Sequence, residues 1–127
     1  MIRKLLKLLP SSIIMFEKKR PWGLFKVFTK NKKSTIKILE INPGQELSLQ
    51  KHKKREEHWY FITPGTIQIG KTKRKVKANT GVVIKKNQAH RIIADKKKVI
   101  VLEISLGTFS ETDEIRLEDK YGRKKKR

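Results

Sequence analysis

The chain has 127 residues, a mass of 14.9 kDa and a formal net charge of +21 at pH 7, from 33 Lys and Arg against 12 Asp and Glu. This length suits one domain with a single core. It has no apolar stretch of the length that a membrane-spanning helix needs. The absence of cysteine excludes disulfides, zinc–thiolate sites, iron–sulfur clusters and cysteine nucleophiles.

The first 14 residues differ in composition from the rest of the chain. They carry three basic residues, no acidic residue, and Leu and Ile pairs interrupted by Pro10. This pattern favours an extension over residues 1–15 that is either disordered or a targeting segment. In the second case, the protein would be directed to an organelle. The lack of cysteine is compatible with the reducing cytoplasm, which is the location that we expect.

Short β-branched or alternating runs follow one another from Trp22 to Leu106 and predict strands. Gly, Pro and Asn residues between the runs predict turns. Many short, closely spaced strands are typical of an all-β sandwich or barrel, and we assign the domain to residues 16–123. The predicted strands are Leu24–Thr29, Thr35–Ile41, Glu46–His52, Trp59–Ile62, Thr66–Ile69, Arg74–Lys77, Val82–Ile84, His90–Ile93 and Val99–Ser105.

An acidic stretch and a basic tail end the chain. Residues 110–119 are rich in Asp and Glu, whereas residues 124–127 are all Lys or Arg and are expected to be disordered. The high charge suggests a polyanion partner, but 25 of the 33 cations are Lys, and Arg is the residue that phosphate and base recognition favours. No nucleic-acid-binding motif is present, so no specific nucleic-acid partner is expected.

Three histidines are the candidate metal ligands. His52 ends one predicted strand, His58 opens the next, and His90 follows a distant strand and turn. Neutral imidazole and carboxylate groups are good ligands for Zn²⁺, Fe²⁺ and Mn²⁺. Two ligands on one hairpin and a third on a distant strand predict a metal site inside a β-barrel.

The order of these residues resembles the cupin superfamily, and within it the type II mannose-6-phosphate isomerases. The same domain forms the C-terminal part of mannose-1-phosphate guanylyltransferase/mannose-6-phosphate isomerases. The resemblance runs from about Glu17 to Arg123. It is carried by Arg20-Pro21-Trp22-Gly23, Pro43-Gly44-Gln45, Leu47-Ser48-Leu49-Gln50-Lys51-His52, Arg55-Glu56-Glu57-His58-Trp59, His90-Arg91, and Asp113-Glu114-Ile115-Arg116 with Asp119-Lys120-Tyr121-Gly122-Arg123.

The resemblance implies an all-β jelly-roll barrel of the cupin (RmlC-like) type. It implies a divalent metal ion and the interconversion of mannose 6-phosphate and fructose 6-phosphate. It also implies a phosphosugar substrate and a homodimer.

The chain departs from the family pattern at two places. Lys54 stands where the family has a second histidine, and a cationic Lys does not ligate a metal ion. Lys85-Lys86-Asn87 replaces the Pro-x-Gly of the second motif. Asn tolerates the left-handed conformation that Gly usually supplies, so we expect the turn to be retained.

Glu57 and His58 are consecutive strand residues and therefore face opposite sides of the sheet. The resemblance favours Glu57 as the inward residue, which gives a metal site of His52, Glu57 and His90. A bulge near Thr63-Pro64-Gly65 would turn His58 inward in place of Glu57. Trp59 is expected to pack in the core.

The remaining candidates serve catalysis and substrate binding. Glu57, His58 and Arg55 are the candidate catalytic residues. Gln50 lies just before the first ligand and is a candidate to hydrogen-bond a sugar hydroxyl. Cationic side chains suit the phosphate group, and the candidates are Arg55, Arg91, Arg116 and Arg123. The alternative for these arginines is a set of salt bridges to the acidic stretch.

Two other functions compete with the isomerase. Lys54 and the altered second motif favour a cupin that has lost catalysis and binds a phosphosugar or a sugar nucleotide. The Lys-rich surface favours a cupin that binds polyanions without sequence specificity.

Overall fold

The computed structural model describes residues 16–123, and its elements are β-strands and one short 3-10 helix, η1. β-branched and aromatic residues dominate the strands, and Asn or Gly at positive φ marks many of the turns. The elements are β1 (Phe16–Arg20), β2 (Gly23–Val27), β3 (Ser34–Ile41), β4 (Leu49–His52), β5 (Glu56–Phe61), β6 (Gly65–Ile69), β7 (Thr72–Val76), β8 (Thr80–Ile84), β9 (His90–Ile93), β10 (Val99–Leu106), η1 (Glu111–Asp113) and β11 (Glu114–Glu118).

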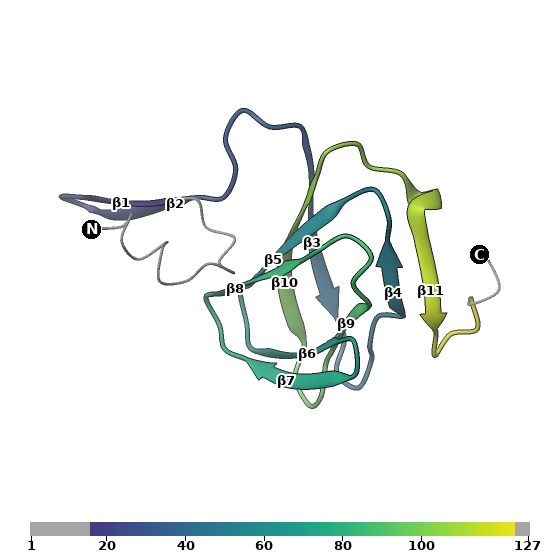
Figure 1. Ribbon diagram of the computed structural model, residues 1–127. Helices are drawn as coiled ribbons and strands as arrows, with labels where there is room; N and C mark the ends of the chain where they lie inside the picture. The colour runs from purple at the N-terminus through teal and green to yellow at the C-terminus, as the bar shows by residue number, and fades with distance from the viewer. Residues whose placement is uncertain (1–15, 124–127) are drawn as a thin grey trace.

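Two antiparallel sheets form the barrel (Figure 1). One has the strand order β3-β10-β5-β8, and the other has the order β11-β4-β9-β6-β7. The prediction of an all-β barrel is therefore confirmed. Of the eleven strands in the described residues, the nine from β2 to β10 lie within a few residues of those expected, whereas β1 and β11 were not predicted because charged residues interrupt their apolar pattern.

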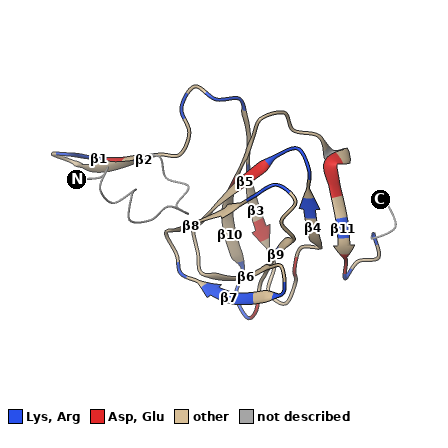
Figure 2. Ribbon diagram, in the orientation of Figure 1, with Lys and Arg blue, Asp and Glu red and all other residues tan. Residues whose placement is uncertain are grey.

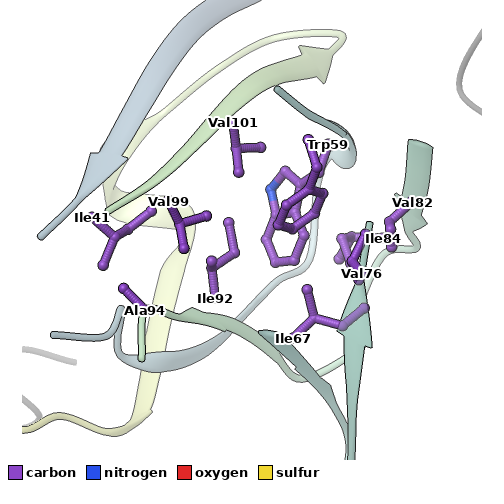
Figure 3. Packing of buried hydrophobic residues seen from close by; sticks show 11 residues of the cluster. Ile41, Trp59, Ile67, Val76, Val82, Ile84, Ile92, Ala94, Val99 and Val101 are labelled. Carbon is purple, nitrogen blue, oxygen red and sulfur yellow. The ribbon is translucent and has the colours of Figure 1, made fainter. Parts of the chain in front are cut away.

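Apolar side chains from both sheets meet inside the barrel (Figure 3). Trp59, Phe61, Ile67 and Ile92 are fully buried, as predicted for Trp59. The rest of the cluster comes from the same inner faces and comprises Ile41, Val76, Val82, Ile84, Ala94, Val99 and Val101. Burial of this apolar surface is the main term that stabilises the barrel.

The interior divides into an apolar end and a polar end along β3, β10 and β5. Residues directly opposite one another in these strands share a face. The rows that face inward at the apolar end are Leu39–Val101–Phe61 and the pair Ile41–Val99. The rows at the polar end are Thr35–Ser105–Glu57 and Lys37–Glu103–Trp59. Polar groups gathered inside a barrel indicate a site rather than a packing surface.

The β1–β2 hairpin forms a separate two-stranded sheet that projects from the barrel (Figure 1). The base of the hairpin contacts the barrel through Lys26 Nζ, 3.1 Å from the Tyr60 hydroxyl, and through Phe28, which packs against the Tyr60 ring. Trp22 lies at the turn of this hairpin and is 72% exposed. The family motif that contains Trp22 is therefore part of a protruding arm.

Lys and Arg are spread over loops and strands of the described residues (Figure 2). β7 is the clearest case, since the four residues from Thr72 to Lys75 are exposed and three of them are Lys or Arg. Among residues 16–123, no helix has the length and hydropathy needed to cross a bilayer. The predicted extension over residues 1–15 and the tail over residues 124–127 lie outside the described residues.

Gly65 at the start of β6 is a sensitive packing position. A Cβ placed there would lie 2.8 Å from Val99 Cγ1 and 3.0 Å from Phe61 Cε2, both in the core. We expect Gly65→Ala to lower the free energy of unfolding by about 1–3 kcal/mol, because the added methyl group overpacks the core. Urea denaturation measures this change. Thr72→Ala, at an exposed position on the adjacent strand, is the control, and equal stabilities of the two variants would contradict the packing account.

Candidate functional site

Three buried residues converge at the polar end of the barrel. His52 ends β4, Glu57 lies on β5 and His90 begins β9. Each is at most 2% exposed, and one ligand atom from each lies within 4.8 Å of the others. The two histidines come from one sheet and the carboxylate from the other, so closure of the barrel creates the group.

The hydrogen bonds of the imidazoles orient them toward Glu57. His90 Nδ1 donates to the carbonyl of Gln88 at 2.7 Å, which leaves His90 Nε2 as the nitrogen that faces Glu57 Oε1, 3.5 Å away. His52 Nε2 donates to Gln50 Oε1 at 3.1 Å, and its Nδ1 lies 3.6 Å from Glu57 Oε2. Each ring thus uses one nitrogen to fix its position and presents the other to the centre of the group.

Arg55 fixes the carboxylate of Glu57. Its Nε donates to Glu57 Oε2 at 2.8 Å, and its Nη1 donates to the carbonyl of Ser110 at 3.0 Å. Both side chains are buried, so the charged pair is shielded from water. Arg55, expected as a catalytic or phosphate residue, therefore contacts the site directly.

The protonation states suit a metal ion. Burial lowers the pKa of His52 to about 4, although the nearby Glu57 carboxylate opposes the shift. Burial acts to raise the pKa of Glu57, but its hydrogen bond to His90, the charges of both histidines and the hydrogen bond from Arg55 together lower it to about 2. At neutral pH the group therefore offers a neutral His52 imidazole and an ionised carboxylate, the forms that bind divalent metals.

The donor set of His52, Glu57 and His90 fits a divalent ion. Two imidazoles and one carboxylate bind Zn²⁺, Fe²⁺ and Mn²⁺, and three protein ligands leave positions open for substrate. Two ligands bonded to one ion at about 2.0–2.2 Å lie at most about 4.4 Å apart. The three ligand atoms already lie within 4.8 Å of one another, so small side-chain shifts would bring all three onto one ion. The group predicted from the sequence is thus brought together.

The loop that carries Lys54 is held by its backbone. The backbone N–H groups of Lys53 and Lys54 donate to the two carboxylate oxygens of Asp113, at 3.0 and 2.9 Å. The Lys54 side chain is exposed, so its ammonium group remains hydrated. The altered second motif also keeps its turn, since Asn87 adopts φ 63° and its N–H donates to the carbonyl of His52 at 2.7 Å. The expected tolerance of Asn at this position is confirmed.

His58 lies on the opposite face of β5 from Glu57. Pairing with β10 and β8 is regular from Glu57 to Phe61, without a bulge that would rotate the strand. His58 Nε2 lies 2.7 Å from Glu56 Oε2 on the outer face. The alternative in which His58 replaces Glu57 as a ligand is therefore wrong, and so is a catalytic contact from His58 inside the barrel.

The other predicted substrate residues divide between the two faces. Gln50 contacts His52, and Arg116 lies opposite Gln50 on the same face, with its Nε 2.9 Å from Glu114 Oε2. Arg91 alternates with His90 and pairs with Glu118 on the outer face, and Arg123 pairs with Asp119 beyond β11. Arg91 and Arg123 therefore form salt bridges to the acidic stretch, which is the alternative given above for these arginines. Neither side chain contacts the three candidate metal ligands.

Two interior residues were missed as candidates. Lys37 and Glu103 are directly opposite each other on β3 and β10 and face the polar end of the barrel. Glu103 Oε2 accepts a hydrogen bond from Trp59 Nε1 at 3.1 Å, and the Trp59 ring packs edge-on against His90 at 5.4 Å between centroids. The available signal was a charged residue that alternation places on the same strand face as apolar residues, such as Lys37 with Leu39 and Ile41.

Glu103 has a strongly perturbed acidity. Burial, with the charge of Glu57 adding to it, raises the pKa of Glu103 to about 7, although the Trp59 hydrogen bond and the Lys37 charge oppose the shift. A raised pKa means that the folded state holds the proton more tightly than the unfolded chain. The resulting stabilisation is fully present below the ordinary value of 4.5 and is lost as the pH rises through 7.

We therefore expect Glu103→Gln to change the pH dependence of stability in metal-free protein. The free energy of unfolding of the wild type, relative to the variant, falls by roughly 1–3 kcal/mol between pH 4.5 and pH 8. Urea denaturation of both proteins at several pH values gives this difference. A difference that stays constant over the range would contradict the raised pKa.

Comparisons with known proteins agree with this geometry. Residues 12–119 match the family model described as "Mannose-6-phosphate isomerase C-terminal". The xanthan biosynthesis protein XanB of Xanthomonas campestris is 32% identical over 108 residues, which cover 82% of this chain and 23% of that protein. The mannose-1-phosphate guanylyltransferase ManC of Salmonella typhimurium is 30% identical over 108 residues, covering 82% and 22%. The chain spans less than a quarter of the length of these relatives.

Solved structures show the same fold. A Klebsiella pneumoniae protein with a double-stranded β-helix domain matches with a TM-score of 0.56 and 19% identity, over 64% of this chain and 73% of that one. A putative sugar phosphate isomerase from Acidithiobacillus ferrooxidans matches with a TM-score of 0.55 and 23% identity, over 59% and 51%. The double-stranded β-helix is the barrel of the cupins, so the predicted cupin fold is confirmed.

Proposed function

Because this chain belongs to the mannose-6-phosphate isomerase C-terminal family, we propose that its barrel interconverts mannose 6-phosphate and fructose 6-phosphate with a bound divalent metal ion. The observation that carries the proposal is the buried group of His52, Glu57 and His90. A cupin that retained only its fold would have no need of two oriented imidazoles beside an ionised, buried carboxylate. The relatives named as a xanthan biosynthesis protein and a mannose-1-phosphate guanylyltransferase support a role in the supply of mannose for polysaccharides.

The reaction moves a proton from C2 of the open-chain aldose to C1, and a second proton from O2 to O1. His52, Glu57 and His90 would hold the ion, which would polarise the sugar carbonyl and offset the negative charge that develops on its oxygen. Arg55 keeps the Glu57 carboxylate in place through the bond at 2.8 Å. Arg55 is therefore a positioning residue as well as a local positive charge.

Glu103 is the group that we assign to proton transfer. It is a buried carboxyl group on the inner face of β10, one row deeper than Glu57. Its pKa of about 7 lets it accept and return a proton near neutral pH.

Gln50 is a positioning residue for the ligand His52. Its Oε1 accepts a hydrogen bond from His52 Nε2, and its Nε2 donates to Ser48 Oγ at 3.0 Å, so both ends of the amide are used to hold the ligand. We place the reaction in the cytoplasm, which cell fractionation would check.

The ligand and proton-transfer roles predict different losses. Glu57→Gln should abolish both metal content and isomerisation, because the site loses its negative ligand. Glu103→Gln should keep the metal and lower turnover by about 10²–10⁴-fold, because only the proton carrier is lost. Metal analysis of purified protein and an assay of fructose 6-phosphate formation measure the two effects.

Lys54→His is the matched test of the family departure. It restores a fourth ligand and should tighten metal binding without being required for it. If the wild type and Lys54→His both fail to bind metal and to isomerise mannose 6-phosphate, the metal-dependent isomerase is refuted. If both bind metal but neither isomerises mannose 6-phosphate, the metal site stands and the isomerase activity is refuted.

We also infer a homodimer. The exposed large apolar residues fall mainly into two groups, which are the tip of the β1–β2 arm (Trp22, Leu24 and Phe25) and the outer face of β3 (Ile36 and Ile38). A lone two-stranded hairpin is marginally stable in water. Each chain has both an arm and an apolar sheet face. In a dimer with two-fold symmetry, the arm of each copy can therefore cover the outer face of β3 of the other copy.

Cysteine cross-linking tests this dimer, because the native chain has no cysteine. When Leu24→Cys and Ile38→Cys proteins are mixed and oxidised, a disulfide-linked heterodimer should form. Lys75→Cys, on β7, replaces Ile38→Cys in the control mixture. A monomer by light scattering at micromolar concentration, or cross-linking that is equal in both mixtures, would refute the arrangement.

A further inference from the structure

Two cations share one aromatic ring at the polar end of the barrel. Lys37 Nζ lies 4.3 Å from the centroid of the Phe109 ring, and Arg55 Cζ lies 4.4 Å from the same centroid. Phe109 belongs to the segment that follows β10, and it is half-buried. The ring thus brings together charges from β3 and from the start of β5.

Both cations are held by the barrel rather than extended into solvent. Lys37 starts from an inward position on β3, so its aliphatic stem runs along the interior and its ammonium group reaches the ring. Arg55 is 4% exposed and is anchored by Glu57 and by the carbonyl of Ser110. Arg55 therefore contacts the proposed ligand Glu57 directly, and Lys37 meets Arg55 at the shared Phe109 ring.

We propose that Lys37 and Arg55 form the subsite for the phosphate group of the sugar substrate. The assignment rests on the proposed function for the identity of the sugar, but not for the affinity for phosphate itself. A phosphate group is a tetrahedral dianion that accepts charge-assisted hydrogen bonds from both kinds of cation, Lys as a point charge and Arg as a fork. Such bonds are stronger than the cation–π contacts that Phe109 makes, so phosphate displaces the ring from the two cations.

The other cations near the site are less suited to this role. Arg91 and Arg123 are paired with acidic residues outside the barrel. Lys53 and Lys54 are exposed on the β4–β5 loop, where water competes for their charge. Lys37 also lies opposite Glu103, so a purely structural role as its counter-ion is the competing explanation.

Binding measurements on the full chain separate these explanations. Isothermal titration with inorganic phosphate, mannose 6-phosphate and mannose is performed on the wild type, Lys37→Met and Lys75→Met. Lys75→Met removes the same charge from exposed β7 and is the control. We expect Lys37→Met to weaken binding of both phosphate compounds by about 10–100-fold and to leave mannose unchanged, because it removes one charge-assisted contact. Lys75→Met should stay within about twofold of the wild type.

Lys37→Arg keeps the charge and should retain most of the phosphate affinity, and thermal melts of each variant establish that it is folded. If Lys37→Met binds phosphate as Lys75→Met does, if it loses mannose equally, or if the wild type binds no phosphate compound, the subsite is refuted. If Lys37→Met does not fold, Lys37→Gln is compared with Lys37→Arg instead. Equal phosphate affinities of these two variants would then refute the subsite. Loss of phosphate binding in a protein that never isomerises mannose 6-phosphate would leave the subsite standing and reject the isomerase.

Discussion

The alternation of side chains along β5 is the constraint on which the site depends. Because successive strand residues face opposite sides, Glu57 points into the barrel and His58 points out of it. The same alternation on β4 and β9 turns His52 and His90 inward. A shift of one residue on β5 would place an imidazole inside and leave Arg55 without its carboxylate partner. The regular pairing of β5 with both neighbours prevents that shift.

A buried carboxylate is costly, and the structure shows how the cost is offset. Glu57 is ionised because Arg55 and two imidazoles surround it. Glu103, one row deeper and without an arginine, has its pKa raised instead. Two buried carboxyl groups inside one barrel therefore differ in acidity. This difference underlies our proposal that Glu57 holds a metal ion and that Glu103 carries a proton.

The sequence was sufficient for most of the strands and for the three residues at the centre. Long, ordered motifs located His52, Glu57 and His90, and strand alternation reduced the choice at Glu57 to two options. The pairing of β5 with β10 and β8 decided between Glu57 and His58, because the presence of a bulge depends on strands that are distant in the sequence. Lys37 and Glu103 were not recognised from the sequence, because the face on which each lies depends on the register of β3 and β10. The protruding position of Trp22 was likewise hidden, because arms and barrel ends have the same local pattern.

We propose that His52, Glu57 and His90 bind one divalent metal ion inside the barrel. A crystal structure of protein loaded with Zn²⁺ or Mn²⁺, with anomalous diffraction recorded at the metal edge, would locate the ion. We expect one strong anomalous peak within about 2.0–2.3 Å of a nitrogen of His52, a nitrogen of His90 and an oxygen of Glu57. A peak located elsewhere, or a metal held without Glu57, would contradict it.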